Sequence, residues 1–320
     1  MSALIPAFDW QRVVVASWTT DLATFGWIVL MGFLANAACG LVGNYLLLRR
    51  MALMGDAVSH SILPGLVLAF LVSGSRGTGP MFLGALVAGV LAAGAIEAIQ
   101  QRSLVKQDAA IGITFSTLFA VGVVLTAVFA AQVDLDAECV LFGEIAFVPL
   151  EPPVALAGFV LGPVSVVRMA VVLGAVIALI AVFYKELLVS SFDAGLAGNL
   201  GLKPRRIHFA LMAVLSVVAV SAFEAVGAVL VIAMLILPGA TATLLVRRLP
   251  AMHAVSVLHA ALSAVLGLHL GVWLECSIGA AMVLAGAGLF ATAWLFAPRD
   301  GLIALAWRRT RAMRGDASGR

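Results

Sequence analysis

The sequence is short of charge: only 11% of its 320 residues are Asp, Glu, Lys or Arg, whereas 63% are hydrophobic. A soluble globular domain carries about 25% charged residues, so water cannot be the solvent for most of this surface. The chain also lacks the GxxxxGK[ST] loop that cradles nucleotide phosphates. If ATP drives this protein, a different subunit must therefore bind it.

Long apolar runs are abundant instead. A membrane-spanning helix needs roughly 20 residues, and the sequence offers nine candidate runs: 25–48, 57–72, 80–100, 109–131, 166–184, 208–223, 225–245, 252–271 and 277–297. The second and sixth runs are short, so eight spans are also compatible. Helices are expected because a bilayer forces each backbone polar group to bond within its own segment, and the alternating ten-residue segments of a β-barrel are absent. The sequence predicts an all-α, polytopic transmembrane helix bundle of eight to nine spans.

The basic residues predict the orientation in the membrane. With the N-terminus outside, 16 of the 19 Lys and Arg residues fall on the cytoplasmic side, and only Arg12, Arg76 and Arg168 fall outside. The positive-inside rule therefore favours an outer N-terminus and a cytoplasmic C-terminus in a plasma (inner) membrane. The net charge of +3 then needs no nucleic-acid partner. The first run lacks a short basic leader before it, so it is predicted to be a retained span rather than a signal peptide.

One membrane domain without an internal repeat is predicted. Residues 1–24 form an outer N-terminal segment, residues 25–300 the membrane domain, and residues 301–320 a basic cytoplasmic tail. Cys139 and Cys276 both fall in outward-facing stretches, so a disulfide between them is conceivable, although nothing in the spacing demands it.

The longest internal loop between spans covers residues 185–207. Asp193 suits an N-cap position and Gly201 a helix stop, which predicts a short helix at about 192–200. On these residues alone, that helix could be an ordinary amphipathic connector.

The pair Asp56 and His60 carries the most chemical information. Four residues apart on a helix, the two side chains share one face, and a charge within the bilayer is costly unless it is paired or hydrated. A carboxylate and an imidazole suit Mn²⁺, Zn²⁺ or Fe²⁺ as ligands. The alternative is structural, with Asp56 capping the helix and His60 bonding to it. Pro64 and Gly65 follow directly, and a broken helix beside ionisable residues is typical of a transport path.

Other polar residues at the spans have competing interpretations. Glu224, in the short break predicted between the sixth and seventh runs, could line the outer half of a path or could be a solvated turn carboxylate. The outward stretch Val133–Phe147 could be an electrostatic funnel for a cation or simply a hydrated loop. The remaining polar residues are expected to reach the interface or to bond to neighbouring helices; they are Glu97, Gln100, His208, His253, His259 and His269.

Five segments, in order, resemble the ABC-3 family of metal-ion permeases. The most specific is ALMGDAVSHSILPGLVLAF, which ends at Phe70. The others are DAAIGITFSTLFAVGVV from Asp108, YKELLVSSFDAGLAGNLG from Tyr184, VGAVLVIAMLILPGATA from Val226, and SIGAAMVL from Ser277. One such segment would be weak evidence, but a collinear match over roughly residues 25–297 is specific.

The resemblance implies a permease like those of type II ABC importers, which pairs with a second copy or a paralogue. It implies a cytoplasmic ATPase subunit, which hydrolyses the ATP, and an extracytoplasmic metal-binding protein that delivers the ion. The permease itself would then be no enzyme and would hold no permanent cofactor, its cargo being Mn²⁺, Zn²⁺ or Fe²⁺. The stretch Val133–Phe147 resembles a segment of family members often assigned to manganese, and this resemblance favours manganese as the cargo.

The resemblance also implies roles for particular residues. Asp56 and His60 would be the metal-path pair, and the loop 185–207 would dock onto the ATPase. Its coupling residues are expected to be Lys185, Glu186, Phe192, Asp193 and Gly201.

Three rival interpretations compete with this one. A proton-coupled secondary transporter would need no ATPase, although the missing inverted repeat counts against it. An intramembrane enzyme could use Asp56 and His60 as an acid–base pair, but no nucleophile motif accompanies them. A purely structural scaffold would leave the pair unexplained.

Overall fold

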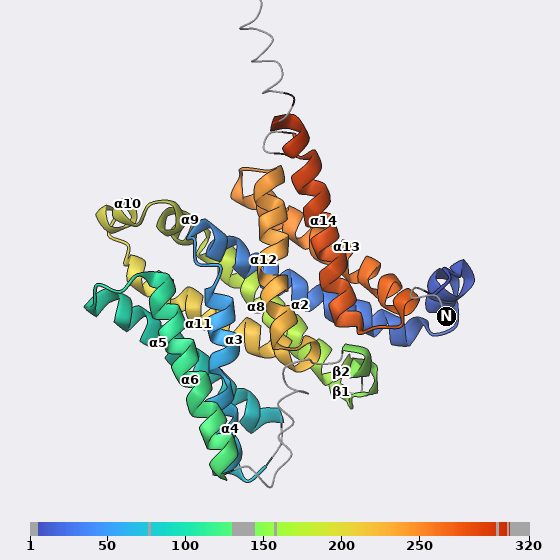
Figure 1. Cartoon of the computed structure of the whole chain (residues 1–320), viewed down its shortest axis with the longest axis horizontal. Helices are drawn as coiled ribbons and strands as arrows, with labels where there is room; N and C mark the ends of the chain where they lie inside the picture. Colours follow the sequence, from blue (N-terminus) through green and yellow to red (C-terminus); the bar gives the residue numbers. More distant parts are fainter. Residues whose placement is uncertain are drawn as a thin grey trace, which may run out of the picture.

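The computed structural model describes residues 6–75, 78–129, 145–156, 159–298, 301–305 and 307. It is a bundle of long helices that cross one another at varied angles (Figure 1). Within the described residues, eight helical units are long and apolar enough to cross a membrane. They are α2 (Leu22–Leu48), the consecutive pair α3 (Met54–Ser61) and α4 (Leu63–Ser73), α5 (Thr78–Arg102), α6 (Gln107–Phe129), α8 (Val164–Val182), α11 (Pro204–Val226), α13 (Leu249–Leu274) and α14 (Ile278–Phe296). The predicted polytopic helical fold is confirmed.

Helix α2 forms the centre of the bundle and contacts α8, α11, α13 and the shorter apolar helix α12 (Ala228–Leu245). Its glycines allow this close packing. A Cβ atom at Gly43 would lie 1.8 Å from the carbonyl oxygen of Leu235 in α12, so the two backbones touch there. Small residues at helix contacts are the usual means of tight association where lipid and protein are equally apolar.

A buried polar seam joins α2 to α13. Asn36 donates to Ser263 Oγ at 2.6 Å, and Asn44 donates to Ser256 Oγ at 3.0 Å. Such bonds stabilise helix pairs inside a membrane. His259 lies between these serines along α13 and is buried, yet neither ring nitrogen has a hydrogen-bond partner among the described residues. The expectation that His259 bonds to a neighbouring helix is therefore wrong.

The N-terminal segment lies against the C-terminal end of α13. A π-helical turn (Gln11–Ala16) and α1 (Ser17–Thr19) provide most of this segment. Arg12 pairs with Glu275 at 2.7 Å, and the Trp18 indole donates to His269 Nε2 at 3.2 Å. The N-terminus and the turn between α13 and α14 therefore share one end of the bundle, and His269 bonds to a neighbouring element as expected.

The opposite end of the bundle gathers the end of α2 and the start of α11, through Arg49 and His208. Helix α11 thus begins at the end opposite the N-terminus, whereas α13 finishes at the N-terminal end. Since α11 and α13 are both long enough to cross, α12 must return across the membrane between them. Over the described helices the connectivity gives nine crossings, one more than the eight found by length and composition.

Three details differ from the sequence prediction. The internal loop holds two helices rather than one, α9 (Tyr184–Phe192) and α10 (Ala194–Asn199). The break between the sixth and seventh spans lies at Gly227, whose φ of +88° favours glycine, so Glu224 lies in the last turn of α11 and not in the break.

The third difference is an antiparallel hairpin, β1 (Pro153–Leu156) and β2 (Phe159–Pro163), preceded by a 3-10 helix (Ile145–Leu150). This stretch falls between the predicted runs 109–131 and 166–184, where no strand was predicted. Glu151 ties it to α8 by accepting from the Ser165 amide at 2.8 Å and from the Ser165 hydroxyl at 2.7 Å. Cys139, most of the acidic stretch 133–147 and most of the basic tail lie outside the described residues, so the expectations placed on them stay predictions.

Candidate functional site

The candidate site sits on the interrupted helical unit α3–α4. Pro64 stands in the first turn of α4, where its missing N–H is tolerated, and the chain changes helix at Ile62. Helix α3 packs against α5, α6, α11 and α12. A Cβ atom at Gly55 would lie 2.6 Å from Leu235 Cδ1, so a larger residue there would force the Leu235 side chain of α12 to shift.

Asp56 and His60 come together as predicted. His60 Nε2 lies 3.2 Å from Asp56 Oδ1, and the two side chains are 28% and 36% exposed, respectively. Two aromatic rings of α6 flank the imidazole, with centroid separations of 5.8 Å to Phe115 and 5.9 Å to Phe119. The pair is therefore neither sealed in helix packing nor fully open.

The structural interpretation of this pair, in which Asp56 caps the helix and His60 bonds to Asp56, is met only in part. Helix α3 begins after Leu53 with no side-chain cap, so Asp56 does not cap it, whereas the contact between Asp56 and His60 is present. Asp56 instead lies in the first helical turn, where a carboxylate complements the helix dipole. One imidazole and one carboxylate still leave most coordination positions of a metal ion empty.

No third ligand among the described residues completes the pair. Within the described residues, no group of three or more His, Cys, Asp or Glu side chains could hold a metal ion. Leu53, Asp56, His60 and Leu63 follow helical spacing along one face that the single chain leaves at least partly exposed. Any further ligand must come from water, from another chain or from residues outside the described part of the structure.

The internal loop has the predicted helix boundaries. Asp193 Oδ1 accepts the Leu196 amide at 2.9 Å, which makes Asp193 the N-cap of α10. Gly201, with φ of +79°, ends the helix by donating to the Gly198 carbonyl at 3.0 Å. Phe192 is 62% exposed and Leu200 61%, so apolar side chains at both ends of α10 are left without cover in this chain.

The first turn of α9 holds the other two residues expected to couple to the ATPase. Lys185 is exposed, and Glu186 is half-buried at the edge of a recess between α8 and α11. The side chain of Glu224 lies outside the described part of the structure.

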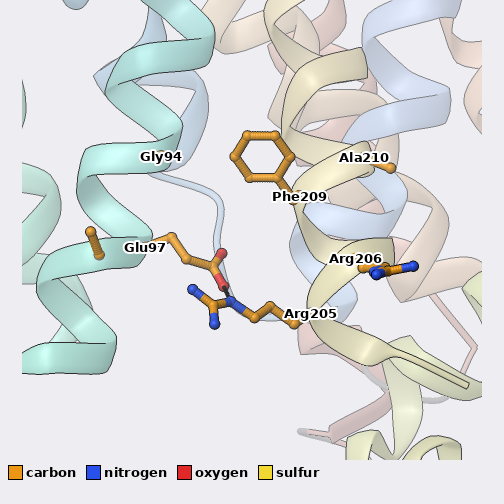
Figure 2. Close-up of a pocket in the computed structure, with 7 residues that line it drawn as sticks. Gly94, Glu97, Arg205, Arg206, Phe209 and Ala210 are labelled. Carbon is orange, nitrogen blue, oxygen red and sulfur yellow. Dashed lines mark ion pairs between the residues drawn. The ribbon is translucent and has the colours of Figure 1, made fainter.

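Two residues expected merely to reach the interface instead meet each other. Glu97 of α5 lies 2.8 Å from His208 of α11, through Oε2 and Nε2. Glu97 lines a recess of about 460 Å³, and its Oε1 lies 3.7 Å from Nε of Arg205. Figure 2 shows the two side chains reaching toward each other. Glu97 and His208 are far apart in the sequence, so no spacing pattern predicts that they meet.

Gln100 and His253 are the remaining two of these polar residues. The side-chain nitrogen of Gln100 is buried without a hydrogen-bond partner in the described part of the chain. His253 packs its ring against Tyr45, with centroids 5.4 Å apart.

A multi-pass helical bundle, with an ionisable pair on an interrupted membrane helix, defines an integral membrane protein of the transporter class. The sequence profile of the ABC 3 transport family matches residues 22–297. The chain belongs to this family.

Relatives of known function agree with this membership. The chain is 45% identical to the manganese transport system membrane protein MntD of Bacillus subtilis, over 87% of this chain and 93% of that protein. It is 40% identical to the zinc transport system membrane protein TroD of Treponema pallidum, over 86% of this chain and 75% of that protein. The solved structure of PsaBC from Streptococcus pneumoniae, in complex with Fab, matches with a TM-score of 0.75 and 33% identity, covering 92% of this chain and all of that one.

Proposed function

We propose that this chain is the permease subunit of an ATP-driven importer of divalent metal ions, with manganese as the principal cargo. The observation that carries the proposal is the Asp56–His60 pair, 3.2 Å apart and partly exposed on an interrupted membrane helix. The cargo passes through, so the permease needs neither a resident cofactor nor covalent chemistry. ATP is hydrolysed by a partner subunit.

A second permease copy, or a paralogue, completes the metal site. Two chains related by a two-fold axis present the same face to each other, so the exposed Asp56–His60 faces would supply two carboxylates and two imidazoles. Two carboxylates neutralise a divalent cation and lower the cost of removing its water shell. Mixed oxygen and nitrogen ligation suits Mn²⁺, Zn²⁺ and Fe²⁺ alike. The preference for manganese rests on relatives such as MntD.

The two ends of the bundle serve different partners. With the N-terminus outside, the end that holds Arg12 and Glu275 faces the metal-binding protein that delivers the ion. The opposite end presents α9 and α10 to the ATPase, through Lys185, Glu186, Phe192, Asp193 and Gly201. Glu224, near Gly227 at the outer end of α11, is proposed to line the outer half of the path.

Metal uptake by proteoliposomes tests this function. The vesicles contain the permease, its ATPase and the delivery protein. Asp56→Asn and His60→Gln should each lower ATP-dependent Mn²⁺ uptake by at least about tenfold, since losing even a supporting group at a metal site costs that much. Asp108→Asn, a carboxylate in the first turn of α6, is the matched control and should transport normally. Wild-type uptake in both site variants would remove the site, and uptake without the ATPase would favour a secondary transporter.

A further inference from the structure

A polar cluster joins four elements at the end of the bundle opposite the N-terminus. Its members are Arg49 directly after α2, Ser190 and Ser191 at the end of α9, His208 near the start of α11, and Glu97 near the end of α5. Arg49 uses all three of its guanidinium nitrogens. Its Nη2 donates to Ser190 Oγ at 2.8 Å and its Nε donates to Ser191 Oγ at 3.1 Å. Its Nη1 lies 3.5 Å from Nδ1 of His208.

His208 is the bridge in this cluster. An arginine only donates, so Nδ1 of His208 must accept and the ring proton belongs on Nε2. Nε2 faces Oε2 of Glu97 at 2.8 Å, although Oε2 has no well-aligned hydrogen bond. The contact is therefore short but oblique. Since a hydrogen bond weakens steeply with misalignment, a small shift of α11 against α5 changes its strength.

Glu97 is held on its other side as well. Its Oε1 accepts from the side-chain amide of Gln101, one turn along α5, and lies 3.7 Å from Nε of Arg205. Figure 2 shows this carboxylate reaching from α5 toward Arg205 on α11. The carboxylate is only 12% exposed, so losing its partners would leave a mostly buried charge, which is costly.

One end of the cluster adjoins α10, which is proposed to dock onto the ATPase. The other end leads through α5 to the α3–α4 unit, which carries the proposed metal ligands. At one end, Ser190 and Ser191 lie just before Asp193, the N-cap of α10. At the other end, α5 touches α4 backbone to backbone: a Cβ atom at Gly65 would lie 2.2 Å from the carbonyl oxygen of Gly84, and one at Gly84 2.3 Å from that of Gly65. Such close packing transmits displacement. Helix α4 continues directly from α3, which carries the proposed metal ligands.

We propose that Arg49, His208 and Glu97 are positioning residues that couple movement of α9 and α10 to α5, and through α5 to the α3–α4 unit. This coupling rests on the proposed function, because it presumes that an ATPase moves α10 and that α3 carries the metal. The decisive quantity is the number of ATP molecules hydrolysed for each metal ion imported.

The experiment uses proteoliposomes with permease, ATPase and delivery protein. Glu97→Gln keeps the shape of the side chain and removes its charge, whereas His208→Leu removes both polar contacts. His208→Gln is the conservative variant, because its amide nitrogen can stand near the place of Nε2. The control is Arg102→Gln, an exposed basic residue at the same end of α5.

Glu97→Gln and His208→Leu should assemble with the ATPase and keep the KM for Mn²⁺, while ATP hydrolysed per ion rises about tenfold, within the usual range of coupling energies. His208→Gln should recover part of the loss, and Arg102→Gln should match the wild type. An unchanged ratio in both Glu97→Gln and His208→Leu overturns the proposal. A fall in transport that only tracks lost assembly also overturns it, reducing the cluster to a structural role. Wild-type vesicles that fail to import Mn²⁺ would instead refute the proposed function.

Discussion

Single glycines set the distance between the central helices. At Gly43 in α2 an added methyl group would meet a backbone oxygen, which cannot move aside as a side chain can. At Gly26 in the same helix, no described atom beyond the helix's own adjacent backbone lies within 4 Å of the added atom. The two positions therefore differ in packing while sharing the same helix.

Gly43→Ala should destabilise the folded protein by about 1–3 kcal/mol or more, the usual cost of overpacking. Gly26→Ala should be nearly neutral or slightly stabilising, because alanine is the better helix former. Thermal unfolding in detergent, followed by size-exclusion chromatography, measures both. Equal melting temperatures for the two variants would contradict the close contact of α2 with α12.

At the scale of elements, α10 depends on its cap. Asp193→Ala should cost the helix about 1 kcal/mol, because the Leu196 amide loses its acceptor. Asp193→Asn keeps an equivalent acceptor and is the matched control. Co-purification with the ATPase should weaken for Asp193→Ala and persist for Asp193→Asn. Equal recovery of the ATPase with both variants would argue that α10 does not dock there.

The sequence predicted the elements that local rules determine. Apolar runs gave the spans, and Asp193 and Gly201 gave the boundaries of α10, because caps and stops act within a few residues. The break was placed at Glu224 instead of Gly227, because the apolar run ends at the charged residue whereas the helix continues as far as Val226. The hairpin was missed because β1 and β2 are short, rich in proline and carry no alternating pattern.

The candidate site was predictable for a similar reason. Asp56 and His60 are one helical turn apart, so their contact follows from local geometry. The contact between Glu97 and His208 depends on how α5 packs against α11, and no local pattern records it. The backbone conformation of Arg50 was likewise not predictable from a local pattern, because it adopts φ of +59° after α2, where glycine is the usual residue.

At the scale of the whole molecule, the account requires nine crossings with the N-terminus outside. Exposed Cys276, in the turn after α13, should react with a membrane-impermeant maleimide in intact cells once Cys139 is replaced by serine. In a second variant, Cys139 and Cys276 are both replaced by serine, and Arg248, between α12 and α13, is replaced by cysteine. This new cysteine should react only after permeabilisation. Cys39 is fully buried and supplies little background. Labelling of both sites in intact cells would contradict the crossing by α13, and a reversed pattern would contradict the crossing by α12 or the orientation.

Local sequence patterns do not predict how this chain pairs with a second one. Among the described residues the chain supplies two candidate ligands and leaves their helix face partly exposed, which is why the proposed site takes its further ligands from a second chain.

The central claim is that His60 and Asp56 bind the transported ion. Electron spin echo envelope modulation of Mn²⁺ bound to the purified, assembled transporter tests it directly, because a coordinating imidazole nitrogen modulates the manganese signal. The account predicts nitrogen modulation in the wild type, its loss in His60→Gln, and its persistence in His269→Gln, whose imidazole bonds to the N-terminal segment. Bound Mn²⁺ whose nitrogen modulation survives His60→Gln would contradict the account.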